Sequence, residues 1–195
     1  LELLRGPLED RQLVLSRARG TVRFPAGFAL VAAANPCPCG FRGHPSRPCG
    51  CTAALVQRYA SRFSGPLMDR IDLRVEVAAL DASDLLASSR GEDSAEVQGR
   101  VWAARERQRA RVCHSRVRSN AELSGEHARI VARCHRDAER LLGWAVDRNG
   151  LSARGYVRVL RVARTLADLE GAQRVGASHV AEALQFRACE GAGGA

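Results

Sequence analysis

The hydrophobic pattern of the first part of the chain is mostly that of β-structure. Residues 12–17 and 21–24 are β-rich runs on either side of an arginine-bearing turn, which predicts a hairpin over residues 12–24. Residues 28–34 form one continuous apolar run, as a buried strand of a parallel sheet does. In residues 71–77 apolar and polar side chains alternate, which predicts a strand with two distinct faces.

Helical spacing interrupts this region twice and then replaces it. Residues 1–10 and 53–63 place apolar side chains near one helical face, and Gly65 with Pro66 ends the second pattern. After a polar linker at residues 88–93, the pattern is helical to near the end of the chain. The predicted helices run from Asp93 to about Arg111, from Ser124 toward Asp147 with an interruption near Gly143, from Ser152 to about Leu169, and from Ser178 to about Ala188.

These patterns predict an α/β part followed by an all-α part. We expect the α/β part over residues 1–88, with the hairpin and a cysteine-rich loop at residues 36–52 included in it. A helical domain is expected over residues 89–190, and residues 191–195 as a disordered tail. No apolar run approaches the ~20 residues that cross a bilayer, so no membrane contact is expected.

Arginine supplies all of the basic charge. The chain has 30 basic residues, none of them lysine, and a net charge of +9. A GC-rich genome accounts for this bias by itself, but the lack of lysine excludes a Gly-x-x-x-x-Gly-Lys phosphate loop and a lysine Schiff base. The chain alone is therefore expected not to hydrolyse ATP. It begins without Met or a signal-peptide layout, so we expect it to come from within a longer polypeptide.

Residues 100–118 concentrate this charge, with Glu106 as the one acid among them. The density suits a phosphate backbone or an acidic partner, and a solvated basic helix face is the alternative. Trp102 lies in the same segment, and we expect core packing rather than base stacking for its side chain. The basic residues are Arg100, Arg105, Arg107, Arg109, Arg111, Arg116 and Arg118.

The placement of cysteine predicts a metal site. Four cysteines within fifteen residues form two Cys-x-Cys pairs, Cys37 with Cys39 and Cys49 with Cys51. Joined by a loop rich in Gly and Pro, they can supply the four soft ligands of a structural zinc site in a cytosolic protein. Four free thiols or two disulfides are the alternatives, and His44 and His114 are spare candidate ligands. The other cysteines are scattered and are interpreted as incidental: Cys113, Cys134 and Cys189.

Three ordered segments resemble one family. Residues 30–40, Leu-Val-Ala-Ala-Ala-Asn-Pro-Cys-Pro-Cys-Gly, are similar to the sensor-1 strand of magnesium-chelatase-like AAA+ ATPases. Residues 64–73, Ser-Gly-Pro-Leu-Met-Asp-Arg-Ile-Asp-Leu, resemble their arginine-finger segment. Residues 151–156 with 162–168 resemble their sensor-2 helix. The cysteine insertion after sensor 1 resembles the ComM/YifB-type branch of bacteria.

The resemblance implies the C-terminal portion of an AAA+ α/β core followed by a helical lid. It also implies that the intact protein binds ATP and Mg²⁺ and forms a homo-oligomeric ring, expected to be a hexamer, in the cytoplasm. Its phosphate loop and Walker B acids are expected before Leu1. Members of this type are linked to DNA, as helicases that drive branch migration during natural transformation. The alternative is a chelatase-type motor that acts on a protein partner and not on DNA.

The resemblance also assigns nucleotide-site roles. Asn35 matches sensor 1, which orients the attacking water, although an Asn before Pro also ends strands. Arg70 matches the arginine finger, which stabilises charge in a neighbour's active site, with a salt bridge to Asp69 or Asp72 as the alternative. Arg154 matches sensor 2.

Two further groups of arginines are candidate phosphate contacts. Arg154, Arg158 and Arg161 share one face of the predicted helix, which either approaches the nucleotide or is a solvated basic face. Hairpins of related ring helicases point into the pore and grip DNA. The resemblance therefore makes the hairpin arginines DNA-binding candidates, with an exposed basic turn as the alternative. They are Arg17, Arg19 and Arg23.

Overall fold

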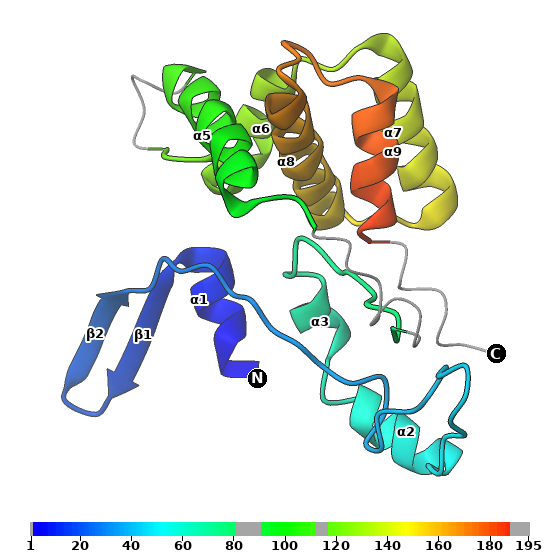
Figure 1. Cartoon of the computed structure of the whole chain (residues 1–195). Coiled ribbons are helices and arrows are strands. Elements are labelled where there is room, and N and C mark those ends of the chain that lie inside the picture. Colours follow the sequence, from blue (N-terminus) through cyan, green and yellow to red (C-terminus); the bar gives the residue numbers. More distant parts are fainter. Residues whose placement is uncertain (1, 81–90, 112–116, 188–195) are drawn as a thin grey trace. The chain divides into compact units, whose positions relative to one another are not determined.

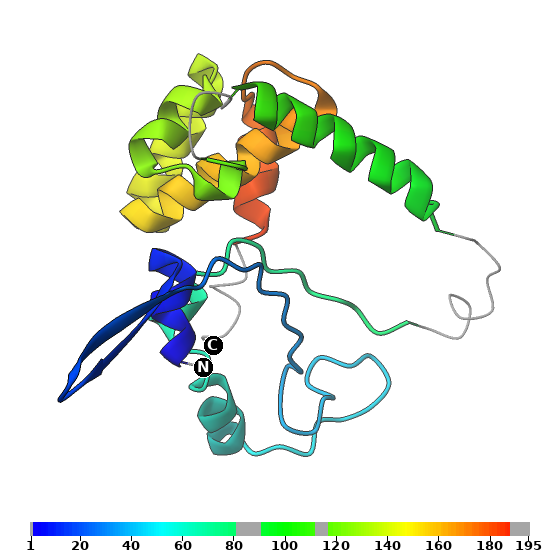
Figure 2. The same ribbon diagram turned by 90° about the vertical axis from the view of Figure 1, so that its left-hand side faces the viewer.

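The computed structural model describes residues 2–80, 91–111 and 117–187 (Figure 1; turned by 90° in Figure 2). It divides the chain into two compact units. The first comprises Leu1–Ile71 and Val77–Asp81, and the second comprises Asp72–Glu76 and Ala82–Ala195. Several sequence expectations lie outside the described residues: residues 88–90 of the polar linker, the tail, Cys113, His114, Arg116 and Cys189.

The first unit opens with two short helical segments and a hairpin. The 3₁₀ helix η1, Glu2–Leu4, leads into α1, Arg5–Asp10, which ends at Arg11 with a left-handed φ of 55°. The predicted helix over residues 1–10 is therefore confirmed.

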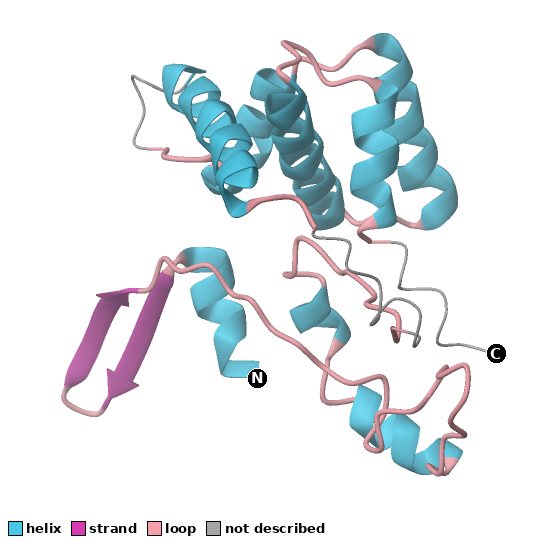
Figure 3. Ribbon diagram, in the orientation of Figure 1, coloured by secondary structure: helices cyan, strands magenta, loops and turns pink. Residues whose placement is uncertain are grey.

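The predicted hairpin is also confirmed (Figure 3). Strand β1, Gln12–Arg17, pairs antiparallel with β2, Gly20–Pro25. Leu13 lies opposite Phe24, and Arg17 lies opposite Gly20, so only two residues form the turn. Every residue of both strands is exposed.

The two other predicted strands are wrong for the part of the chain that is described. Residues 28–34 and 71–77 form no strand, and Val31 is 94% exposed. A strand needs a hydrogen-bonded neighbour, and the described residues pair only β1 with β2. Instead, the Arg74 N–H donates to the Phe186 carbonyl at 3.0 Å. The described chain is thus a mixed helical protein with a small two-stranded sheet.

Residues 26–52 contain no helix or strand, and two short helices follow them. Helix α2, Ala53–Ala60, is capped by Thr52 and confirms the predicted helix at 53–63, although it ends earlier. Helix α3, Gly65–Met68, was not expected. Its Pro lies in the first turn, where the missing N–H costs nothing, so Gly65 and Pro66 begin a helix here, whereas α2 already ends at Ala60.

The second unit is built around one long helix. Helix α8, Ala153–Glu170, packs against α5, Ser94–Arg111, α6, Gly125–Ala132, and α9, Ala177–Gln185. Helix α7, Arg136–Asn149, packs against α9, and the 3₁₀ helix η2, Asn120–Glu122, against α8. The largest fully buried apolar side chains of this core are Leu142, Leu160, Val159, Val175 and Val180.

The helix expected from Ser124 is interrupted, but not at Gly143. That glycine lies inside α7, and the break comes at Arg133, with a left-handed φ of 46°. There the backbone pairs with a distant segment: the His135 N–H donates to the Val175 carbonyl at 2.9 Å, and Val175 N–H donates to Ala132 at 3.2 Å. This pairing depends on the tertiary structure, and no local sequence pattern predicts it. The helices expected from Asp93, Ser152 and Ser178 are confirmed as α5, α8 and α9.

A buried ionic cluster joins α5 and η2 to α8. Asp168 is fully buried and pairs with Arg164, itself 1% exposed, at 3.0 Å. Two further groups donate to the Asp168 carboxylate: Asn120 Nδ2 at 2.8 Å and Arg111 Nη1 at 3.2 Å. Arg164 also donates to the Gln173 carbonyl. Burial lowers the pKa of Arg164, and the Asp168 charge opposes that shift. None of the described helices combines the length and hydropathy needed to cross a bilayer.

Candidate functional site

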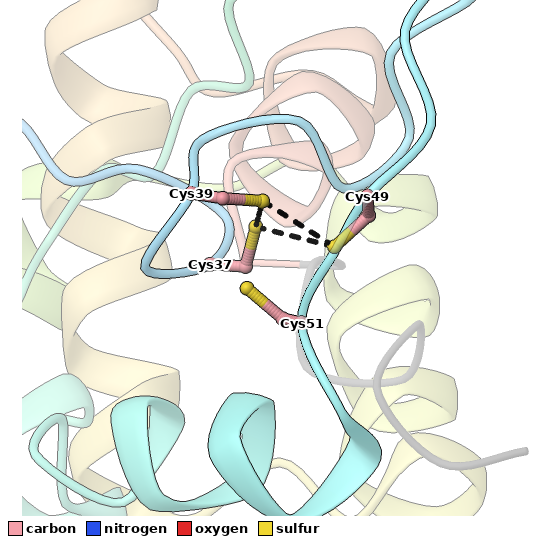
Figure 4. A group of neighbouring side chains, drawn as sticks. All are labelled: Cys37, Cys39, Cys49 and Cys51. Carbon is pink, nitrogen blue, oxygen red and sulfur yellow. Dashed lines mark hydrogen bonds between the residues drawn. The ribbon is translucent and has the colours of Figure 1, made fainter.

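The four clustered cysteines converge on one point (Figure 4). The sulfur of Cys37 lies 3.3 Å from that of Cys39 and 3.7 Å from that of Cys49, and the Cys39 and Cys49 sulfurs are 3.6 Å apart. With Cys51 included, all four sulfurs lie within 4.8 Å of one another. Cys37 is fully buried, and Cys39 is exposed.

Local turns hold the two arms of this loop. The Gly40 N–H donates to the Cys37 carbonyl at 3.0 Å and closes the first arm. Gly40 has a φ of 81°, a left-handed conformation that glycine adopts without steric cost. On the second arm, Cys51 is followed directly by Thr52, whose hydroxyl accepts from the Leu55 N–H at the start of α2. The second pair of ligands is therefore fixed to a helix terminus.

The sulfur positions fit a tetrahedral metal ion. Metal–sulfur bonds of about 2.3 Å give a tetrahedron with sulfur–sulfur edges of about 3.8 Å, close to the three separations above. They are far longer than the ~2.05 Å of a disulfide bond, and the cysteines are free thiols. The four cysteines can therefore hold a metal ion. His44 is not part of the converging group, and its Nδ1 accepts from the Ser46 and Arg47 N–H groups, each at 3.2 Å.

Without a cation the thiols would not ionise together. The Phe41 backbone N–H and the Cys37 thiol lower the pKa of Cys39 to about 6. A hydrogen bond from the Cys39 backbone lowers the pKa of Cys51 in the same way. Burial and the neighbouring thiols outweigh this effect and raise the pKa of Cys51 to about 12. Several thiolates at such separations repel one another, and a bound cation removes this penalty. The donor set thus suits a metal that prefers sulfur.

Asn35 lies just before this loop. A Cβ built on Gly40 would lie 3.9 Å from the Asn35 side chain, so the first arm folds back toward it. Asn35 is exposed and follows an unpaired segment rather than the buried strand that its sequence context suggested. Its sensor-1 role stays a prediction.

Arg70 is held inside the first unit. Its guanidinium pairs with Glu9 of α1, and Nη1 donates to the Pro66 carbonyl at 2.7 Å. The side chain is 10% exposed, and its Nε is buried without a hydrogen-bond partner. Sequence reasoning did not identify Glu9, because it lies 61 residues away and no local pattern links the two positions.

The three arginines expected on one face of α8 have different environments. Arg158 is buried and pairs with Asp72, and Arg161 Nε donates to the Leu123 carbonyl at 2.8 Å. Arg154 is exposed in the first turn of α8, two residues after the Ser152 cap. Arg158 and Arg161 therefore contribute to tertiary contacts, and Arg154 is the exposed member of the three, in the first turn of α8.

The hairpin arginines are all exposed. Arg23 lies opposite Val14, whereas Arg17 lies opposite Gly20, and Arg19 is in the turn between the strands. Side chains alternate along a strand, so Arg17 and Arg23 lie on opposite faces. The hairpin thus presents positive charge at its tip and on both sides.

The expectation that Trp102 packs in the core is wrong. Its side chain is 55% exposed on α5, and the Arg109 guanidinium lies 5.6 Å from its ring centroid. Arg107 and Arg111 of the same helix turn inward, toward the carbonyl and carboxylate of Asp168. The arginine-rich segment therefore divides between an inner, structural side and an outer side.

Comparison with known proteins covers nearly the whole chain. The family described as "Magnesium chelatase, subunit ChlI" matches residues 1–85, and "Magnesium chelatase, subunit ChlI C-terminal" matches residues 91–187. An uncharacterized protein of Mycobacterium tuberculosis is 46% identical over 189 residues, 96% of this chain and 37% of its own length.

Two relatives carry names from the expected branch. Protein YifB of Salmonella typhimurium is 40% identical over 193 residues, 97% of this chain and 37% of the relative. The competence protein ComM of Haemophilus influenzae is 40% identical over 190 residues, 96% of this chain and 36% of the relative. The chain thus spans little more than a third of the length of these relatives. It belongs to the magnesium-chelatase-like family and is of the ComM/YifB type.

Proposed function

We propose that this chain serves a ring-forming AAA+ ATPase that moves DNA, as in ATP-driven branch migration during natural transformation and recombination. The observation that carries DNA as the substrate is the exposed hairpin, with arginines at its tip and on both faces. Arginine neutralises backbone phosphates without reading sequence, which suits a motor that must move along any DNA. The likeness to a competence protein supports the same substrate.

The proposed nucleotide site draws three residues from this chain. Asn35 orients the attacking water as sensor 1, Arg70 acts as the arginine finger and Arg154 acts as sensor 2. The phosphate loop belongs to the rest of the intact protein, because this chain has no lysine, and by family resemblance the acidic residues that hold Mg²⁺ are expected there as well. Arg70 pairs with Glu9, so its action on a neighbouring subunit requires that this ion pair open.

The metal proposed for the cysteine cluster is zinc in a structural role. Cys37, Cys39, Cys49 and Cys51 would complete a tetrahedral sphere and leave no open position for catalysis. The ion would fix the loop at residues 36–52, which has no helix or strand of its own.

The proposed organisation follows the family. Residues 1–88 contribute the later part of an AAA+ α/β core, and residues 89–190 form its helical lid. Identical subunits assemble into a ring, expected to be a hexamer, in the cytoplasm. The strand-like segments at residues 28–34 and 71–77 would find their sheet neighbours in the rest of the intact protein.

Replacing the hairpin arginines tests the DNA assignment. The variant R17Q/R19Q/R23Q is expected to bind duplex DNA more weakly, with the slope of log K against log salt smaller by about 2 to 3. The matched control is R136Q/R140Q/R148Q, which removes three exposed arginines from α7. Fluorescence anisotropy with a labelled duplex over a salt series measures both. Equal losses in the two variants would contradict a specific role for the hairpin.

A second candidate function is a chelatase-type motor that acts on a protein partner. The observation in its favour is that both matching families are described by a magnesium chelatase subunit. The two candidates differ in what stimulates the ATPase of the intact protein. Duplex or branched DNA raises the rate of a DNA motor and leaves that of a chelatase motor unchanged.

A further inference from the structure

Helix α5 exposes an aromatic and basic surface that is separate from the hairpin. We call Trp102, Arg105 and Arg109 the Trp102 surface. Trp102 is 55% exposed, and the Arg109 guanidinium stacks 5.6 Å from its ring centroid. Exposing the large apolar surface of Trp to water is unfavourable, and its flat indole can stack on any nucleic-acid base, whatever the sequence.

This surface is on the outer side of the helix. Trp102, Arg105 and Arg109 are spaced i, i+3 and i+7, which places them on one side of α5. Of the buried side chains of α5, Ala104 lies away from this surface, whereas Gln108 lies at its edge and accepts from Arg105 Nη1 at 3.4 Å. In the second unit α5 is a long helix that extends past its neighbours (Figure 2). All three side chains of the Trp102 surface are exposed.

The charge around Trp102 distinguishes it from a second exposed tryptophan. Helix α5 has five arginines and two glutamates in its sequence, whereas α7 has three arginines and three acids. Trp144 of α7 is 52% exposed, almost as much as Trp102. Positive charge thus accompanies an exposed indole on α5 but not on α7. Glu106 partly offsets this charge, because it pairs with Arg109 at 2.6 Å.

We propose that the Trp102 surface binds single-stranded nucleic acid, with an unpaired base stacked on Trp102 and the backbone phosphates near Arg105 and Arg109. Bases in a duplex are stacked on one another, so an indole of this kind selects unpaired strands. Guanidinium groups stack on aromatic rings and still offer donors to phosphate, which suits their spacing beside the indole. This inference rests on the proposed action of the protein on DNA. The residues of the Trp102 surface are separate from the hairpin arginines.

The test compares two tryptophans in the same chain. Fluorescence anisotropy is measured with a labelled 20-nucleotide single strand, with the corresponding duplex, and with heparin as a polyanion that has no bases. W102A is expected to weaken single-strand binding by about 5- to 100-fold and to leave heparin binding unchanged. W102F is expected to retain most of the affinity, because phenylalanine also stacks. W144A is the matched control and is expected to stay within about twofold of the parent.

The arginines are tested by salt dependence. R105Q/R109Q should reduce the single-strand salt slope by about 1.4, whereas R140Q/R148Q on α7 should leave it unchanged. The proposal is overturned if W102A and W144A weaken binding equally, if W102A weakens heparin binding as much as single-strand binding, or if W102A alters self-association in sedimentation but not nucleic-acid binding. Repeating W102A in the R17Q/R19Q/R23Q background separates the two sites. Loss of duplex binding with retained Trp102-dependent single-strand binding supports this inference independently of the hairpin.

Discussion

At the residue scale, one side-chain type fills several different roles in this protein. Arg164 is buried beside Asp168, Arg158 is buried beside Asp72, and Arg109 lies on the outer face of α5 against Trp102. Arginine can do this because its guanidinium stays charged, is planar and offers five donors. In a chain with no lysine, therefore, the count of basic residues overstates the charge available to an outside ligand.

The metal cluster makes a direct prediction at single residues. Cys49→Ser should remove one ligand, and the bound zinc per chain should fall from about one to well below one. Cys134→Ser is the control, because that thiol is half-buried outside the cluster. Elemental analysis of protein purified without added metal measures both variants. Metal-free, folded parent protein with four titratable thiols in the loop would contradict the zinc assignment.

Asp168→Asn should be strongly destabilising. The substitution removes the only carboxylate described beside Arg164 and leaves that guanidinium buried with less compensation, which costs about 3–5 kcal/mol for a buried pair. Glu106→Gln is the control, because its ion pair with Arg109 is exposed and such pairs contribute about 0–1 kcal/mol. Urea unfolding followed by circular dichroism measures both free energies. Similar small losses would mean that the buried pair contributes little.

At the element scale, helix boundaries follow two kinds of signal. Thr52, Ser64 and Ser152 begin helices by accepting a backbone N–H through their hydroxyls. Of these three helix starts, the one at Ser152 is predicted from the sequence. The end of α6 follows no such rule, because Arg133 has a left-handed backbone that side chains disfavour. Pairing of the next residues with the segment around Val175 holds it there.

This contrast predicts opposite effects at two helix ends. Arg133→Gly should stabilise the protein by about 1 kcal/mol, because glycine adopts the left-handed conformation without the clash of a Cβ. Gly150→Ala, at the left-handed residue that ends α7, should destabilise it by a similar amount. Thermal and urea unfolding of the two variants give the comparison. A loss of stability in Arg133→Gly would show that its side chain contributes more than the backbone strain costs.

At the scale of the whole molecule, the proposed finger role of Arg70 predicts that subunits complete one another's sites. Arg70→Ala in the intact protein should lower ATP turnover by about 10³-fold or more and preserve nucleotide binding, because a finger acts mainly on the transition state. Steady-state ATPase and nucleotide-binding assays measure the two effects. Mixing these subunits with subunits that carry a dead phosphate loop should restore part of the activity, because some interfaces then pair an intact finger with an intact loop.

The ion pair between Arg70 and Glu9 suggests the alternative to a finger role, which is a structural role for Arg70. If Arg70 serves only to hold α1, then Glu9→Gln and Arg70→Ala should lower the melting temperature by similar amounts. Mixing should then restore nothing, although rings still assemble. That combination would make Arg70 a structural residue.

The sequence by itself determined the parts of this protein whose signals are local. The hairpin follows from adjacent β-rich runs, the helices from spacing over three and four residues, and the cysteine pairs from two short motifs. The three family motifs were also recognisable in the sequence, in their order along the chain, and the comparisons confirm the family. Each of these signals depends on residues close together in the sequence.

The tertiary structure alone decided which of these residues meet. It placed the four sulfurs within 4.8 Å, turned Arg107 and Arg111 inward and left Trp102 outside. It also paired residues 61 and 86 positions apart, as in the ion pairs of Arg70 and Arg158. Strand patterns without a neighbouring strand stayed unpaired for the same reason. Burial, ion pairing and sheet formation need a partner, and the partner's position is set by the folded chain rather than by the local pattern.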